Sequence, residues 1–540
     1  MPDDLTARNA EGLRRPLDAA TDLGRKLDKL STQLDKLGKR LDRIEALGQR
    51  VTTYIDENRA VGRKQFAQTA LVDARAEHDR RFGHHQMVRR SVTGMLQAMT
   101  TGVVRPAVLL RTAEQLMIDD PGYWLSPAQV ALAALACDNP VSAKRAVLEA
   151  VSRDPGRSAL FFSLVLGRFG RHDAAARWIA EYARAQDHNA LTGDFTTVLD
   201  AVARGALGGP ARERLLDTCR GWRDQIGQSG QQEAKQVTSW RRFIRRQRRP
   251  LTDTFHPLGM VSRDWAAKLD RLETAAAFGY TEQWLEGRLG GTGESDETLP
   301  ATVDDLLREL IAAPDQAECA LLEAVGRWQA IIERDGYPPA PASDDPGEPA
   351  RTDFLTLSTA IATGTYQSDL SEQAARFCLL LSRTSVQRAV ADLSQQVKST
   401  YPASIGVDIR GWHHAIEPGD DPDALVQEFL EWAHDAMNED KAQATRKRLG
   451  ISKPSARLER IESTWKARKQ EGQETVYQAA RQANDFYAKW QKGIAAAGEC
   501  VELLRDQSAW GDTREPRTGH GTARPAMRLP AWDLEPPDPG

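Results

Sequence analysis

The sequence lacks the short motifs that mark nucleotide-driven and common hydrolytic enzymes. It contains no G-x-x-x-x-G-K-[ST] loop to hold phosphates, no G-x-G-x-x-G segment after a strand, and neither H-E-x-x-H nor G-x-S-x-G. Each of these spacings is imposed by the chemistry that it serves. Apolar heptads near both ends invite comparison with membrane-remodelling GTPases. Those enzymes need a phosphate-binding loop to hydrolyse GTP, and this sequence lacks one. We therefore expect a protein that is not an enzyme and uses no cofactor.

Cysteine is scarce and long apolar runs are missing. The chain has five cysteines without a Cys-x-x-Cys pair or a histidine at ligand spacing, so we expect buried free thiols rather than disulfides or a zinc site. The first twenty residues are polar and carry Asp3, Asp4 and Glu11, which does not fit a signal peptide. The most apolar window, 95–110, is interrupted by Arg105 and Pro106, so a membrane span is not expected. These absences favour a cytoplasmic location.

Neither sign of charge dominates, and strand patterns are nearly missing. The net charge is −4 with 27% charged residues, which excludes a nucleic-acid binder that works through its overall charge. Only residues 405–409 alternate as a strand would, and one strand cannot form a sheet. The remaining windows are rich in Ala, Leu, Arg and Glu, so the sequence predicts an all-α fold.

The N-terminal segment carries apolar residues alternately three and four positions apart, except where Gly48 takes an expected position. This is a heptad repeat, with Leu27, Leu34, Leu41 and Ile55 at position a and Leu23, Leu30, Leu37, Ile44 and Val51 at position d. Charged pairs such as Asp35 and Lys36 fall at b and c, on the solvent side. Such a narrow stripe suits a partner helix better than a globular core. We expect a coiled coil that self-associates; a long helix lying across its own domain is the alternative, and leucine at both a and d leaves the strand number open.

A second heptad set lies near the C-terminus, within a helix that we expect to begin after Pro454. Its residues alternate between small and aromatic types: Val476, Ala480, Ala483, Tyr487, Trp490, Ile494, Ala497, Val501 and Leu504. That mixture fits packing against another helix of the same chain better than a symmetric dimer. The N-terminal helix is one candidate partner.

Stretches rich in glycine, proline and acidic residues divide the chain. The segments 287–303 and 336–352 have this composition and predict linkers, and the proline-rich segment 509–540 predicts a disordered tail. The resulting domains are a coiled-coil stalk (1–60), a helical domain (61–286), a helical segment (304–335) and a second helical domain that ends in a long helix (353–508).

Residues 124–187 resemble the tetratricopeptide repeat. In a first unit, Ala143, Val147, Ala150 and Pro155 stand where that family places small, large, small and closing proline residues, with Trp124, Val130 and Ala134 in the helix before. A second unit offers Phe161, Leu164, Gly170, Ala175 and Ile179 but lacks the proline. The resemblance covers 64 residues, and close-packed helical hairpins of any kind place small residues in this way. It implies a solenoid whose first helices line a concave surface for peptides or partner proteins; an ordinary helical bundle is the alternative.

Two pairs of adjacent histidines are candidate chemical sites. Neighbouring residues on a helix point about 100° apart, so neither His84 with His85 nor His413 with His414 chelates one ion without help. The second pair lies in the acidic segment 407–423, which we expect to be a loop. An enzyme with a site near His413 is one alternative function.

The segment 239–250 (SWRRFIRRQRRP) concentrates positive charge. Its basic and aromatic residues are Trp240, Arg241, Arg242, Phe243, Arg245, Arg246, Arg248 and Arg249. A helix here suits an anionic membrane or a nucleic-acid backbone. The alternative is a solvated helix whose arginines pair with carboxylates of neighbouring helices.

The sequence therefore predicts a helical scaffold or adaptor that binds protein partners and self-associates. Peripheral binding to anionic lipid or nucleic acid through 239–250 is the first alternative. The partner and the pathway do not follow from the residues.

Overall fold

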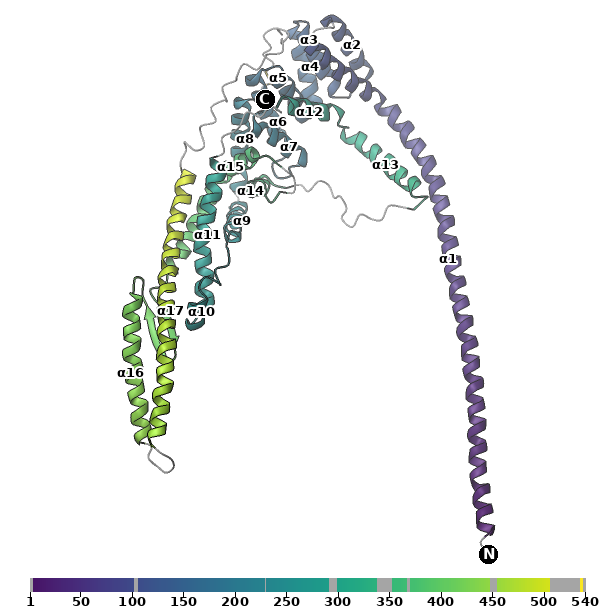
Figure 1. The fold of residues 1–540 in the computed structure, drawn as a ribbon. Helices are drawn as coiled ribbons and strands as arrows, with labels where there is room; N and C mark the ends of the chain where they lie inside the picture. Colours follow the sequence, from purple (N-terminus) through teal and green to yellow (C-terminus); the bar gives the residue numbers. More distant parts are fainter. Residues whose placement is uncertain are drawn as a thin grey trace. The chain divides into compact units, whose positions relative to one another are not determined.

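A computed structural model describes residues 3–101, 105–228, 230–290, 299–337, 352–366, 370–446, 454–505 and 535–537. Within these ranges the chain is almost wholly helical, and its one sheet there has two strands (Figure 1). The predicted all-α fold is confirmed. The predicted tail falls outside the described residues except for 535–537, which have no regular structure. In the part of the chain that is described, no helix combines the length and hydropathy needed to cross a membrane.

The elements run in the following order: α1 (Asp3–Thr101), α2 (Pro106–Asp119), α3 (Leu125–Ala136), α4 (Pro140–Arg153), α5 (Pro155–Arg168), α6 (His172–Arg184), α7 (Gly193–Arg204), α8 (Gly209–Gly227), α9 (Gln231–Arg246), α10 (His256–Val261), α11 (Trp265–Leu289), α12 (Leu299–Ala312), α13 (Gln316–Glu333), α14 (Phe354–Thr363), α15 (Glu372–Ser399), β1 (Ile405–Ile409), β2 (Trp412–Ile416), α16 (Pro422–Arg446) and α17 (Pro454–Arg505).

Contacts divide the chain into two compact units. Unit 1 combines Met1–Met87 with Ala313–Gly347, and unit 2 combines Val88–Ala312 with Glu348–Gly540. The division differs from the one read from composition, because α1 continues as one helix well past residue 60 and α13 belongs with it. α13 is far from α1 in the sequence, so only tertiary contacts place it in unit 1. Composition does not reveal such contacts.

Unit 1 is built from α1 and α13, which pack antiparallel. Lys64 Nζ donates to Asp335 Oδ1 at 2.7 Å, and the rings of Phe66 and Trp328 meet edge to face at 5.5 Å. Farther along α1, His78 contacts Glu318 near the start of α13, whereas Lys64 contacts Asp335 just past its end. The two helices therefore run in opposite directions. Asp315 begins α13 by accepting a hydrogen bond from the Glu318 backbone N–H at 2.8 Å, as an N-cap does.

Unit 2 begins with helical hairpins. α3 packs against α4 and α5 against α6, and α6 in turn packs against α8. Capping side chains and prolines start these helices: Asn139 and Asp154 each accept a backbone N–H, and a proline follows each at the first helical position. The residues that carry the repeat resemblance in the first hairpin, from Trp124 to Ala150, are buried.

The rest of unit 2 packs around α15 and α17. The long C-terminal helix α17 lies beside α11, α15 and α16 (Figure 1). Its heptad residues Val476, Ala480, Ala483, Tyr487, Trp490, Ala497 and Leu504 are buried there, in the core of unit 2. These side chains therefore contact helices of their own unit, as their mixture of small and aromatic residues predicts.

The segment after residue 404 forms a β-hairpin. β1 pairs antiparallel with β2, with Ile405 opposite Ile416 and Asp408 opposite His413. The turn residues Arg410 and Gly411 have φ values of 57° and 94°, the left-handed pair that a two-residue hairpin requires. The predicted loop at 407–423 is thus wrong for its first ten residues. An Arg-Gly turn lacks the Asn-Gly or Asp-Gly signal by which such hairpins are recognised, and the second strand places His414 on its core face, between Trp412 and Ile416.

Candidate functional site

The predicted coiled-coil stripe of α1 faces solvent in this single chain. Every stripe residue with a described side chain is exposed, from Leu30 (56%) through Leu41 (67%) to Ile55 (42%). Leu23 and Leu27 lie outside the described side chains. Solvent-exposed leucines and isoleucines repeated along more than three heptads are unusual for a monomeric soluble protein, because a contiguous apolar patch normally marks an interaction site.

The exposed apolar face extends beyond the predicted stripe. Further exposed residues at the flanking heptad positions e and g, or at d, are Leu47, Tyr54, Val61, Phe66 and Val72. The face thus runs along α1 from Leu30 to Val72, and we call it the α1 face. Sequence analysis missed its second half because the next a and d positions after Ile55 hold asparagine, glycine, glutamine and threonine, so the strict two-in-seven pattern stops.

α13 covers a different side of α1. Ala60 and Ala67 are buried, at 2% and 0% exposure, and His78, which is also buried, follows eleven residues after Ala67, about three helical turns. With about 100° between successive helical residues, these positions lie on the side opposite Val51 and Ile55. Small side chains at 60 and 67 let the two helices approach closely. α1 therefore has one side covered by its own chain and another side open.

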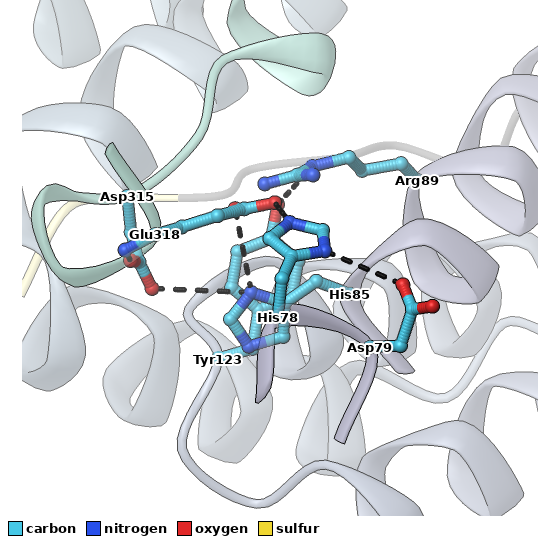
Figure 2. A network of polar contacts seen from close by, with 7 residues as sticks. All are labelled: His78, Asp79, His85, Arg89, Tyr123, Asp315 and Glu318. Atoms are coloured by element: carbon cyan, nitrogen blue, oxygen red, sulfur yellow. Dashed lines mark hydrogen bonds and ion pairs between the residues drawn. The ribbon is translucent and has the colours of Figure 1, made fainter. Parts of the chain in front are cut away.

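Two histidines and a buried glutamate join α1 to α13 (Figure 2). His78 Nε2 lies 3.3 Å from Glu318 Oε1, and His85 Nδ1 lies 3.8 Å from Glu318 Oε2. Glu318 is 1% exposed, and both imidazoles are buried. A buried carboxylate is stable only when donors surround it, so this cluster fixes which turn of α13 meets which turn of α1.

Acidic neighbours complete this cluster without making a metal site. His85 Nδ1 is 3.9 Å from Asp315 Oδ2, and His78 Nδ1 is 3.5 Å from Asp79 Oδ1. Among the described residues, no three His, Cys, Asp or Glu side chains have the arrangement needed to hold a metal ion. We call His78, His85 and Glu318 the polar lock, because their contacts hold α1 and α13 together.

The sequence signal for this lock was the spacing of His78 and His85, not the adjacency of His84 and His85. A separation of seven places two histidines on one side of a helix, whereas neighbours diverge. The acidic partner, Glu318, lies 240 residues away in the sequence, so no local pattern could identify it. Figure 2 also draws a separate contact within unit 2, where Arg89 Nε donates to the hydroxyl of Tyr123 at 3.0 Å.

The arginine-rich segment lies on α9 and just after it, and most of its charges are engaged. Arg241 forms an ion pair with Asp392, and Arg248 Nη1 lies 2.6 Å from Asp270 Oδ1. Arg249 stacks 4.3 Å from the ring centroid of Tyr280, and Arg245 donates to Gln396 at 3.4 Å. Arg242 and Arg246 are exposed.

Trp240 does not belong to any external surface in this segment. Its side chain is 0% exposed and packs against Phe243 and Trp284, with ring centroids 5.7 and 6.2 Å away. Membrane binding by a short amphipathic helix needs its apolar side free to enter the lipid. Since Trp240 and Ile244 are both in the core, that part of the surface hypothesis is wrong.

The hairpin histidines point to different surroundings. His413 is exposed, with Nδ1 3.4 Å from Asp408 Oδ2, and Arg263 approaches the same oxygen at 3.4 Å. The ring of His414 stacks on Trp412 at 4.7 Å. A pocket of about 430 Å³ lies beside this hairpin, lined by Arg263, Asp264, Lys268, Gly406, Val407, His413, His414 and Ala415.

Acidic residues after the hairpin shape the turn into α16. The Glu417 backbone N–H donates to Asp420 Oδ2 at 2.7 Å, and Asn484 Nδ2 on α17 donates to the Asp420 carbonyl at 2.9 Å. The Asp423 N–H donates to Asp421 Oδ1 at 3.2 Å, as the backbone at the start of a helix does to an N-cap side chain. These contacts account for Asp420 and Asp421 structurally, without reference to His413.

α5, the first helix of the second repeat-like hairpin, packs against another helix of the same chain. α12 packs against both α5 and α7, and its residues Val303, Leu306, Leu307 and Ile311 are buried. Arg168 on α5 contacts Asp304 on α12 at 2.9 Å. α5, one of the helices that the repeat resemblance assigns to a concave surface, thus already packs against an amphipathic helix of unit 2.

Comparison with known proteins adds no relative to this picture. The chain matches no protein-family model, no curated protein and no solved structure. The function must therefore be argued from the arrangement of its residues.

Proposed function

We propose that this protein is a non-enzymatic helical scaffold that assembles through α1, with a second copy of the same chain covering the α1 face. The observation that carries the proposal is the exposure of the heptad residues from Leu30 to Ile55 in the single chain. Leucines at a and d are self-complementary, because the same stripe on another copy supplies both knobs and holes. Association would remove these side chains from water without changing the fold of either unit.

The energetic case rests on burial. Fully burying one leucine or isoleucine contributes roughly 1.5 to 3 kcal/mol, and seven described stripe residues are exposed. Even partial burial of so many side chains on two copies exceeds the entropic cost of association, which is on the order of 4 to 15 kcal/mol. Without a partner, the exposed part of α1 depends on its intrinsic helical propensity alone, which is marginal.

The test is the mass of the full-length protein in solution. Changing Leu34 and Leu37 to aspartate places charges in the stripe, so we expect light scattering to show a dissociated protein. A matched control changes Ala46 and Thr53, which lie on the outer side of α1 at position f, to aspartate and should leave the assembly intact. If the wild type is a monomer at tens of micromolar, or if the stripe variant keeps the wild-type mass, the proposal is wrong.

We also propose a cytoplasmic setting and a role in bringing protein partners together. The five cysteines are free, and Cys219, Cys378 and Cys500 are buried, which suits a reducing compartment. Multiple copies joined through α1 would present repeated copies of unit 2, whose hairpins resemble a partner-binding repeat. Binding of anionic lipid or nucleic acid is the less supported alternative, since four of the six arginines in 239–250 already have contacts within the chain.

A further inference from the structure

From the charges and shapes along the α1 face we infer that the copies associate in parallel and in register, over Leu30 to Val72, with each copy's own α13 on the outside. This inference rests on the proposed self-association and deepens it by naming the orientation. Three observations support it: one charge pair, one apolar pair and the side of α1 that α13 occupies.

The charge pair is formed by Arg40 and Glu45. With Leu41 at position a, Glu45 lies at position e of the same heptad. Arg40 lies at position g of the heptad before. In a parallel coiled coil, a g residue faces the e residue five positions later on the partner, and such pairs set orientation. Arg40 of each copy would meet Glu45 of the other, giving two attractive contacts. In an antiparallel pair, e faces e and g faces g, so Arg40 and Glu45 would not meet.

The apolar pair lies farther along the same face. Val61 falls at g and Phe66 at e, again five positions apart, and they are 54% and 65% exposed. Phe66 touches Trp328 of its own α13 by one ring edge and leaves most of its surface open. In a parallel arrangement, Val61 of the second copy would cover Phe66. Both g-to-e matches thus use the same spacing and the same register.

α13 contacts the α1 face at Phe66, through Trp328, and otherwise lies on another side of α1. His78 contacts Glu318 of α13, Gly336 just after α13 lies against Ala60, and Ala67 is buried; these residues of α1 lie on the side away from Val51 and Ile55. Its own Leu322 is 40% exposed. Two copies can therefore pair along the α1 face beyond Ala60 without displacing either α13. The association surface then includes Val61 and Phe66, which lie at g and e outside the two-in-seven pattern, and Val72, which lies at d beyond the predicted stripe.

Cysteine cross-linking in the full-length protein tests the orientation. Position a of one parallel, in-register helix faces position a of the other at a Cα distance that a disulfide can span. Leu34→Cys should therefore form a 34–34 cross-linked dimer under mild oxidation, while Lys39→Cys, at the outer position f, should give only the wild-type background. Leu34 is exposed, so this change leaves the fold of the single chain intact.

Charge reversal supplies a second readout. Glu45→Arg creates two Arg–Arg contacts in the parallel arrangement and should weaken association about tenfold, while Arg40→Glu combined with Glu45→Arg should restore it. Cross-linking at 34 together with restoration by the double variant supports the inference. An assembly that dissociates on Leu34→Asp and Leu37→Asp, but neither cross-links at 34 nor responds to Glu45→Arg, overturns the orientation and keeps self-association. A monomeric wild type overturns both.

Discussion

Gly336, just past the end of α13, lies against the backbone of Ala60 on α1. A Cβ atom at Gly336 would sit 1.8 Å from the Ala60 carbonyl oxygen, and Gly336 has a φ of +87°. Both facts demand glycine, because a side chain would collide with backbone that cannot move aside and would also strain the left-handed conformation. This contact closes one end of the α1–α13 pair, and the cluster of His78, His85 and Glu318 closes the other.

The first prediction concerns that contact. Gly336→Ala should loosen the end of α13 from α1, with a local cost of at least about 2 kcal/mol from the left-handed backbone and the collision together. Hydrogen exchange should then quicken in residues 325–337. Gly326→Ala is the matched control, since a Cβ there meets nothing within 4 Å and the helix interior favours alanine. Equal protection in both variants would contradict the close approach.

The second prediction concerns the polar lock. Glu318→Ala removes the carboxylate that His78 and His85 face, leaving two buried imidazoles with lost contacts at a cost of roughly 1 to 3 kcal/mol. We expect faster proteolysis between residues 313 and 337. Glu323→Ala changes an exposed glutamate on the same helix and should behave like the wild type. Unchanged proteolysis of the Glu318 variant would show that the lock contributes nothing.

The third prediction tests close packing of α17 in unit 2. A Cβ at Gly493 would lie 2.4 Å from the Ala275 carbonyl oxygen on α11. Gly493→Ala should therefore destabilise unit 2 by about 1 to 3 kcal/mol, despite the better helical propensity of alanine. Gly498→Ala on the same helix meets open space and should stabilise by about 0.5 to 1 kcal/mol. Thermal melting of the two variants should shift in opposite directions, and a shared sign would refute this packing.

The helices were predictable because their signals are local. Proline and capping residues mark the starts of α4 and α5. Periodicity, in the form of heptads, identifies α1 and α17. What the heptads cannot tell is which partner they meet. The small and aromatic residues of α17 indicated a partner in the same chain, and unit 2 supplies it. The plain leucine stripe of α1 indicated another helix, and within the single chain it stays exposed.

The candidate site was predicted only in part, for reasons of distance along the chain. The pairing of His78 with Glu318 and of Lys64 with Asp335 joins segments more than 200 residues apart, and no single-sequence pattern links them. The arginine segment shows the converse problem. The buried Trp240 and Ile244 share one side of α9, and only the structure reveals that α11 and α15 pack against this helix. A pattern shows that a surface is amphipathic, not what occupies it.

The last prediction is a loss of stability at alkaline pH. Burial raises the pKa of the Cys219 and Cys378 thiols well above their ordinary 9.0 and that of Cys500 to about 12. Burial likewise raises the pKa of the Tyr182 and Tyr487 hydroxyls above their ordinary 10.0. Above pH 9 the unfolded chain loses thiol protons that the folded chain keeps. The unfolded state then binds fewer protons, so the free energy of unfolding must fall as pH rises.

Each such thiol should lower the free energy of unfolding by about 1.4 kcal/mol per pH unit above 9, until its own folded pKa is reached. Urea unfolding between pH 8 and pH 10.5 measures the slope. Cys378→Ala should reduce this slope by about 1.4 kcal/mol per pH unit, the contribution of one thiol, whatever its effect on stability at neutral pH. Val386→Ala, which removes a buried but non-ionising side chain from the same helix, should lower stability uniformly and keep the wild-type slope. Identical slopes for the wild type and Cys378→Ala would mean that this thiol ionises as readily in the folded protein as in the unfolded chain, and that it is not buried as described.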